Sequence, residues 1–382
     1  MCLINVGMHP SSQQLQELSN DLLEGFLLHL NHSMLVSTKP DTRSAFYEIQ
    51  PSMSLKFNAE VSWPGNGPLF YLFNWGTCLS LCDAAMTLAS LPEFYKAIAC
   101  DSFASTSVND GPLVRCRFGD YTPIDEQIEE SFIFPLKRYT EDPKRQHLGN
   151  VLFELAAKFV SLHEQGHALH GHLHYMANRG SRKFYWCEFD EEAAHAVNAD
   201  PESLTVQALE LQADGFACEF LFQILLRSGA GALFPESPLF IEGDDSAENW
   251  LFFCYLAATM VYCILEKVDT HRSSALSSRR HPPARVRLLG CIASFRRQLI
   301  VAIPDETRRE RFLSNLHREM YTIFRLIGAD PLEREAFIEY FSVPRDELVH
   351  PTSRYLDKLI RHLESLGSEL SVYIQAANKV FR

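Results

Sequence analysis

The residues best suited to chemistry are two histidines that enclose a glutamate, in the run His163-Glu164-Gln165-Gly166-His167. The surrounding residues, LFELAAKFVSLHEQGHALHGH, are typical of a helix. Two histidines four positions apart leave the same face of a helix about 5–6 Å apart at Cβ, so both rings can reach one metal ion. Glu164 points partly away from that ion and can act on water beside it. The pattern predicts a zinc site.

A catalytic zinc ion commonly takes three protein ligands and keeps a fourth position for water. One source of a third ligand is the trailing group His170, His172 and His174. The metzincin pattern requires glycine at position 170 and histidine at 173, but the chain has His170 and Leu173 there. If the helix continues, His170 and His174 lie on the ligand face, one and two turns further along. We interpret the three as cleft-lining or solvent-facing residues, with metal ligation as the less favoured alternative.

A better third ligand is Glu210, which lies on the next predicted helix. Asp214 follows one turn later on the same face, where its carboxylate can accept the ring N–H of a ligand histidine and thereby orient the imidazole. The small residues Ala213, Gly215 and Ala217 would let the two helices pack closely. The alternative for Glu210 and Asp214 alone is an ordinary solvated helix face.

A third polar group is His281-Pro282-Pro283-Ala284-Arg285-Val286-Arg287, where two prolines begin a predicted helix. His281 could donate a hydrogen bond to the oxyanion that forms when water attacks a carbonyl. Arg287 could pair with Asp214 or with another carboxylate of the site. Taken alone, the segment also fits a plain helix start with solvent-facing basic residues, namely Arg279, Arg280 and Arg285.

Together, the motifs HExxH, ExxAD and HPPxxxR resemble those of the gluzincin metallopeptidases, above all the family of the HtpX heat-shock protease and the CAAX prenyl endopeptidase. The first two motifs are also similar to those of the phage-exclusion peptidase Lit and of other cytosolic bacterial zinc peptidases. The resemblance covers roughly residues 150–290. It implies a zincin-like catalytic core in which His163, His167 and Glu210 bind Zn2+, while Glu164 is the general base and acid.

The same resemblance implies that Asp214 orients a ligand histidine and that His281 with Arg287 supports the transition state. HtpX and the prenyl endopeptidase are integral membrane proteins, whereas this chain shows no convincing membrane span. Its most apolar stretch, residues 251–265, is shorter than the roughly 20 residues that cross a bilayer. We interpret this stretch as a buried core helix and leave membrane association open.

The amino-acid composition indicates which binding partners and which cellular compartment to expect. A net charge of −13 argues against nucleic acid and anionic membranes as main partners. Ten cysteines without any CxxC pair, and an N-terminus without a signal-peptide pattern, predict free thiols and a cytoplasmic protein. Cys78 and Cys82 are interpreted as buried thiols rather than metal ligands. The acidic run over 188–192 is interpreted as a solvated loop.

The predicted fold class is mainly α (α+β), with a small N-terminal sheet formed by two or three strands over 45–73. Predicted helices cover 11–37, 76–100, 147–176, 204–228, 247–267, 283–302, 305–327, 331–341 and 354–379. A linker is expected near Asp142-Pro143. We divide the chain into an N-terminal α+β region (1–145), the zincin-like core (146–300) and a C-terminal helical region (301–382).

These observations predict a zinc-dependent metalloendopeptidase that hydrolyses peptide bonds of a protein substrate and is selective. A further possibility is a highly selective protease, such as a toxin or an anti-phage factor, that cuts one host protein. The alternative is a non-catalytic protein in which zinc stabilises a regulatory or partner-binding fold. Neither the substrate nor the oligomeric state follows from the sequence.

Overall fold

The structure is a computed structural model, and it describes residues 47–52, 59–62, 69–91, 94, 142–179, 185–187, 201–228, 246–268, 281–327 and 334–380. The predicted helix over 11–37, the acidic run over 188–192, and Arg279 and Arg280 lie outside these residues.

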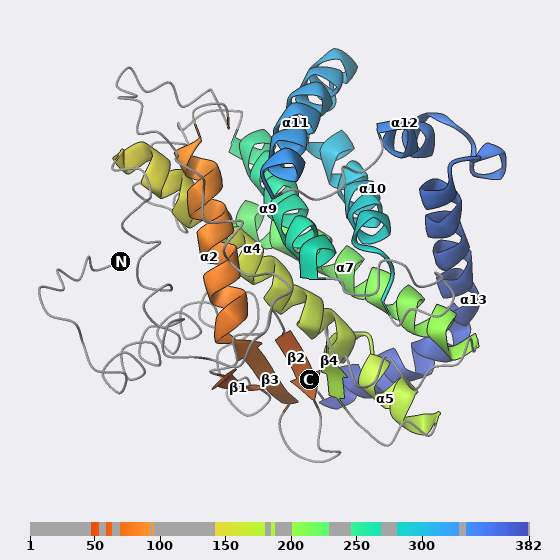
Figure 1. Ribbon diagram of the computed structural model, residues 1–382. Helices are drawn as coiled ribbons and strands as arrows, with labels where there is room; N and C mark the ends of the chain where they lie inside the picture. The colour runs from red at the N-terminus through yellow and green to blue at the C-terminus, as the bar shows by residue number, and fades with distance from the viewer. Residues whose placement is uncertain are drawn as a thin grey trace, which may run out of the picture.

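The described residues are mostly helical, with one small sheet, which confirms the predicted fold class (Figure 1). The helices are α2 (Trp75–Ser90), α4 (Pro143–Leu169), α5 (His172–Asn178), α7 (Pro201–Ser228), α9 (Ser246–Val268), α10 (Ala284–Ala302), α11 (Glu306–Ile327), α12 (Arg334–Ser342) and α13 (Pro351–Val380), with a 3-10 turn at Arg345–Glu347. The strands are β1 (Tyr47–Ser52), β2 (Ala59–Ser62), β3 (Leu69–Asn74) and β4 (Tyr185–Cys187).

The sheet joins the N-terminal segment to the part of the chain between the two motif helices. Its strand order is β1-β3-β2-β4, with β1 parallel to β3 and with β2 antiparallel to both β3 and β4. The sheet lies beneath the ends of α2 and α4 in Figure 1, and α4 contacts β2. Strand β4 was not predicted from the sequence. The division into three regions remains a prediction.

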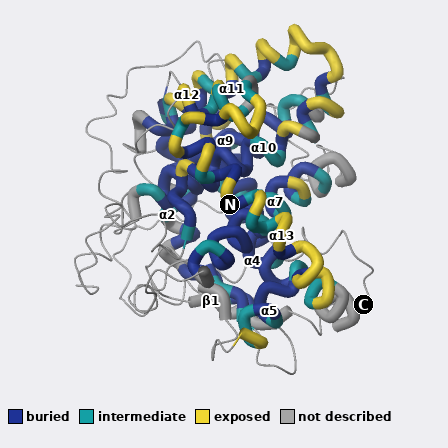
Figure 2. Tube along the Cα trace, turned by 90° about the vertical axis from the view of Figure 1, so that its right-hand side faces the viewer, coloured by how far each residue is buried: buried dark blue, intermediate teal, exposed yellow. Residues whose placement is uncertain are grey.

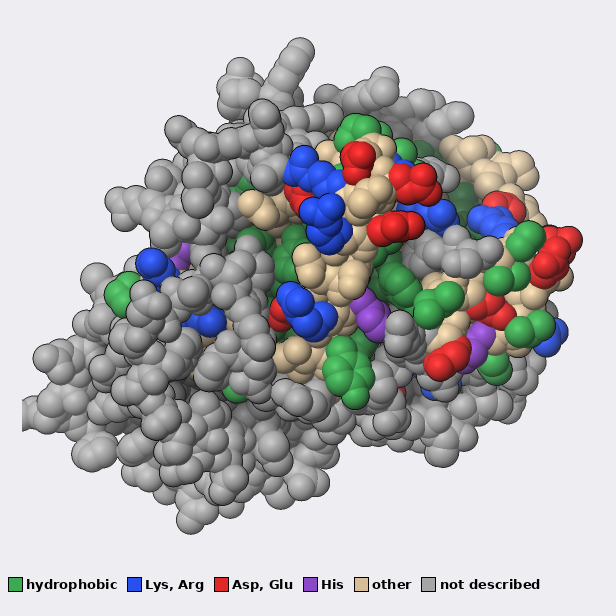
Figure 3. Space-filling model, turned by 90° about the horizontal axis from the view of Figure 1, so that it is seen from above, with side chains coloured by type: hydrophobic (Ala, Val, Ile, Leu, Met, Phe, Trp, Pro, Cys, Tyr) green, Lys and Arg blue, Asp and Glu red, His purple; other side chains and the backbone are tan. Residues whose placement is uncertain are grey.

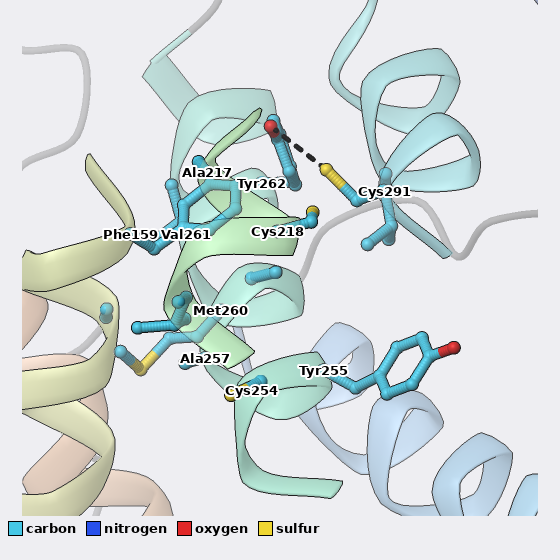
Figure 4. Close-up of a cluster of buried hydrophobic side chains, with 14 of the residues drawn as sticks. Phe159, Ala217, Cys218, Cys254, Tyr255, Ala257, Met260, Val261, Tyr262 and Cys291 are labelled. Carbon is cyan, nitrogen blue, oxygen red and sulfur yellow. Dashed lines mark hydrogen bonds between the residues drawn. The ribbon is translucent and has the colours of Figure 1, made fainter. Parts of the chain in front are cut away.

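Helix α9 runs through the centre of the helical layer and is almost wholly buried (Figure 2). In Figure 4 its side chains pack against Phe159 of α4, Cys218 of α7 and Cys291 of α10. Within the described residues, Glu248–Glu266 is the one segment long and apolar enough to cross a membrane, and 89% of it is buried inside the protein. Helices that form the core of a protein have the same length and composition, so this is weak evidence for a membrane span.

Helix α11 is amphipathic and covers one side of α9. Phe312, Leu316 and Met320 are buried, while Arg308 reaches across to Glu248 of α9 with 2.7 Å between Nε and Oε2. Acidic and basic side chains are interspersed on the face shown in Figure 3. The C-terminal part of the chain therefore contributes packing to the same core as the motif helices.

The start of α4 corrects the predicted linker. The Asp142 carboxylate accepts a hydrogen bond from the backbone N–H of Lys144 at 2.8 Å, and Pro143 occupies the first helical position. An aspartate N-cap followed by proline is a common start of a helix, because the carboxylate satisfies a free N–H and proline has none to satisfy. Asp142-Pro143 is thus the first turn of the long motif helix.

The end of α4 corrects the predicted helix over 147–176. The helix ends at Leu169, and Gly171 has φ 72°, so the chain turns before α5 begins at His172. A Cβ at Gly171 would lie 2.6 Å from the backbone carbon of Tyr373 in α13. Glycine is required here both for the left-handed conformation and for the close approach of α13.

Helices α4 and α7 are in close contact at Gly166, within the HExxH motif. A Cβ at Gly166 would lie 3.0 Å from the Cα of Ala213. This contact agrees with the expectation that small residues allow the two helices to pack closely. Gly215 contributes to a different contact, because its Cβ position faces Ser294 of α10 at 3.5 Å.

We expect Gly166→Val to lower the free energy of unfolding by about 1–3 kcal/mol, because the added methyl groups meet backbone atoms of α7 that cannot rotate away. Urea denaturation measures this loss. The control is Gly367→Ala on α13, where no atom lies within 4 Å of the new Cβ. Alanine there should stabilise the helix by up to about 1 kcal/mol. Equal stability of the two variants would contradict the close contact.

Candidate metal centre

Three buried side chains from α4 and α7 converge on one point. The Nε2 atoms of His163 and His167 are 3.0 Å apart. Glu210 places Oε2 at 3.4 Å from the Nε2 of His163 and Oε1 at 3.6 Å from the Nε2 of His167. Tetrahedral ligands at about 2.0–2.1 Å from a metal ion lie about 3.4 Å from one another. His163, His167 and Glu210 therefore form a buried group that could hold a metal ion.

Asp214 orients the first of these histidines. Its Oδ1 lies 2.8 Å from the Nδ1 of His163, so the Nδ1–H of the ring donates to the carboxylate. The Nε2 lone pair of His163 then faces the other two donor atoms. The structure thus places Asp214 where the sequence suggested, one helical turn beyond Glu210 and against a motif histidine.

Arg287 from α10 binds Asp214 with both ends of its guanidinium. Its Nε donates to Oδ2 at 2.9 Å and its Nη2 donates to Oδ1 at 2.8 Å. The same Nη2 lies 3.3 Å from Oε2 of Glu210. Burial raises the pKa of Asp214, but the charge of Arg287 and the contact with His163 outweigh it and hold that pKa below its ordinary value. Arg287 therefore keeps a fully buried carboxylate ionised.

His281 lies at the edge of the group, just before α10. Its Nδ1 is 3.3 Å from Oε1 of Glu210, and its side chain is 21% exposed. Burial disfavours ionisation of Glu210, yet electrostatic attraction toward His281, His167 and Arg287 lowers the pKa of Glu210 well below its ordinary value. The segment HPPxxxR is therefore more than a solvent-facing helix start, since His281 and Arg287 both reach Glu210.

Glu164 is completely buried on α4, next to His163. Its carboxylate lies close enough to Tyr71 of β3 that, after burial itself, its charge is the largest cause of the raised pKa of that phenol. The Tyr71 hydroxyl donates to Oγ of Ser161 at 3.0 Å. The sheet thus reaches the motif helix beside Glu164. The sequence predicted strands over this stretch without any role for Tyr71 at the site.

The interpretation of the trailing histidines is wrong for His172, which is fully buried rather than cleft-lining or solvent-facing. Its Nδ1 lies 2.8 Å from the Nδ1 of His167, and its Nε2 lies 2.9 Å from Oε1 of Gln212. Burial lowers the pKa of His172 to about 3. His170 and His174 are half-buried, and the ring of His170 lies against that of Phe216.

Comparison with known families places part of the chain beside a peptidase family. The model of the family Peptidase U49 matches residues 120–299 of the chain, a segment that includes every predicted site residue. The match supports a peptidase. The family is Lit-like, so it agrees with the resemblance to Lit and does not test the resemblance to HtpX and the prenyl endopeptidase. No curated protein and no solved structure matches the chain.

We expect Arg287→Met to destabilise the fold by about 3–5 kcal/mol, because it leaves the carboxylates of Asp214 and Glu210 buried without their guanidinium. Urea denaturation of the metal-free protein measures the loss. The control is Arg308→Met, since the pair of Arg308 with Glu248 is partly exposed and should contribute less than about 1 kcal/mol. Equal losses in the two variants would show that the buried pair has no special role.

The histidine environment predicts how stability depends on pH. In the unfolded chain His172 has a pKa of about 6.5, whereas in the folded protein its pKa is about 3. Between these values the unfolded state binds a proton that the folded state does not, so stability falls as the pH falls. His167, whose pKa burial lowers well below 6.5, adds to this slope. Below about pH 4 the depressed pKa values of Asp214 and Glu210 give a further loss.

The measurement is urea denaturation of the metal-free protein between about pH 5 and pH 8. We expect a plateau above about pH 7 and a decline below about pH 6.5, with a shallower decline in His172→Phe. Stability that is constant or rises from pH 7 toward pH 5 is the contrary result.

Proposed function

We propose that the chain is a zinc-dependent metalloendopeptidase in which His163, His167 and Glu210 hold Zn2+. The observation that carries the proposal is the convergence of three buried donor atoms from two helices, at spacings that suit a tetrahedral metal ion. The match to a peptidase family over the same segment supports it. The order of the motifs, with a glutamate third ligand from α7, favours a gluzincin-type arrangement.

The donor set suits zinc rather than calcium or magnesium. Two imidazole nitrogens and one carboxylate suit Zn2+, whereas calcium and magnesium prefer sites made only of oxygen ligands. The balance of buried charges in the site also favours a divalent cation. When ionised, Glu164, Glu210 and Asp214 carry three buried negative charges, and the buried guanidinium of Arg287 neutralises one of them. A divalent cation balances the remaining two while both motif histidines stay neutral.

Zinc, when bound, supplies Lewis acidity that polarises the scissile carbonyl and lowers the pKa of water. Glu164 takes a proton from the attacking water as oxygen bonds to the carbonyl carbon. It then delivers this proton to the amine nitrogen as the carbon–nitrogen bond breaks. His281, partly exposed at the edge of the site, donates a hydrogen bond to the carbonyl oxygen as negative charge develops there. Arg287 and Asp214 hold the ligand side chains in place.

The proposed substrate is a protein or peptide, and we expect the enzyme to be selective for few targets. We also expect a cytoplasmic location, in keeping with the free thiols of the cysteines that the structure describes.

The test is Glu164→Gln, which removes the general base and retains the shape of the side chain. We expect proteolysis to fall by at least about a thousandfold, since glutamate both accepts and returns the proton, while zinc stays bound in a 1:1 ratio by elemental analysis. The readout for an unknown substrate is a proteomic comparison of cells that express the wild type or Glu164→Gln.

His163→Ala is the companion variant, and it should lose the metal. Neo-termini that appear only with the wild type support the peptidase. Equal cleavage by Glu164→Gln rejects the assigned base. Bound zinc without any wild-type cleavage identifies instead a non-catalytic, zinc-stabilised binding protein.

A further inference from the structure

A line of hydrogen bonds runs from Gln212 through His172 to His167. Gln212 Oε1 lies 2.9 Å from the Nε2 of His172, and the Nδ1 of His172 lies 2.8 Å from the Nδ1 of His167. The Nε2 of His167 is the atom that faces His163 and Glu210. The line therefore begins at a neutral amide and ends at the candidate metal ligand.

The chemistry of the groups sets the direction of these hydrogen bonds. An amide oxygen only accepts, so the Nε2 of His172 must carry the proton that it donates to Gln212. In a neutral imidazole the other nitrogen is then an acceptor, so the Nδ1 of His172 accepts from the Nδ1–H of His167. With its proton on Nδ1, His167 keeps the Nε2 lone pair directed at Glu210 and His163. The complete burial of both rings favours their neutral forms.

We propose that His172, held by Gln212, is a positioning residue that sets the tautomer and the ring orientation of the zinc ligand His167. The inference rests on the proposed function, because it needs a metal ion at this site. The two ligand histidines are then oriented by different means. His163 donates to the charged Asp214, whereas His167 donates to the neutral imidazole of His172. His172 therefore orients His167 without adding charge to a site that already buries three carboxylates.

The turn at Gly171 is what brings His172 to this position. In an uninterrupted helix, five residues turn the chain by about 140° relative to His167, so the two Nδ1 atoms could not face each other. The left-handed Gly171 ends α4 and restarts the chain as α5, with the backbone of Tyr373 against it. The C-terminal helix α13 therefore supports the metal ligand through this turn.

The experiment measures metal binding rather than activity alone, with the full-length protein. Zinc affinity is measured by competition with a chromophoric chelator, and the ligand field is measured from the visible absorption of the Co2+-loaded protein. We expect His172→Phe and Gln212→Leu to weaken zinc affinity by about 10- to 100-fold and to change the Co2+ spectrum, as is typical when the group that orients a ligand is lost. His172→Asn, which can still accept from His167, should recover part of the affinity.

His174→Phe is the matched control. It removes another histidine of α5 whose side chain leaves the helix about 200° away from His172, and it should bind zinc as tightly as the wild type. Wild-type affinity and an unchanged Co2+ spectrum in His172→Phe would overturn the inference, as would equal losses in His172→Phe and His174→Phe. If His172→Phe does not fold, the half-buried Gln212 provides the deciding variant.

The outcomes separate the two proposals. A wild-type protein that binds neither Zn2+ nor Co2+ rejects the proposed metal site and the positioning role with it. If the wild type binds zinc and cleaves nothing, while His172→Phe and Gln212→Leu lose zinc affinity as expected, the result supports the positioning role and rejects the peptidase.

Discussion

The buried ion pair between Arg287 and Asp214 is the interaction on which the rest of the site depends. Removing a carboxylate from water costs several kcal/mol, and here Asp214, Glu210 and Glu164 are all completely buried. The guanidinium of Arg287 makes two hydrogen bonds to Asp214 and also reaches Glu210. Arg287 therefore connects α10 to α7. Because Asp214 also contacts His163, the same pair connects both helices to α4. Without this pair, the carboxylates that define the site would favour solvent over the core.

The local part of the site could be predicted from the sequence because helical geometry sets it. The four-residue spacing of His163 and His167, and that of Glu210 and Asp214, each require one face of one helix. A buried carboxylate also requires a partner. Arg287 was predicted to pair with Asp214 or with another carboxylate of the site. The fold class was predictable for a similar reason, since the long apolar periodicities extend over whole helices.

The remaining features depend on contacts between distant parts of the chain. A single glycine inside a helical pattern costs only about 1 kcal/mol, so HGHLHYM reads as a continuous helix. What decides the turn is the packing of Gly171 against Tyr373, some two hundred residues later. His172 and Gln212 belong to the site only as a result of that turn. Similarly, three residues of β4 give little signal alone and become a strand by pairing with β2.

The proposed metal site would link metal binding to folding, because its donor atoms come from two buried helices. The donor atoms come from α4 and α7, which touch through the small pair Gly166 and Ala213. Glu210 and Glu164 are both completely buried, in a medium that screens charge poorly. A divalent cation held by His163, His167 and Glu210 would add its binding free energy to that of folding, since the unfolded chain has no such site. The strand that carries Tyr71, the turn at Gly171 and helix α13 all reach these two helices. In the proposed metal site, a bound ion would therefore stabilise these elements as well, through the α4–α7 contact.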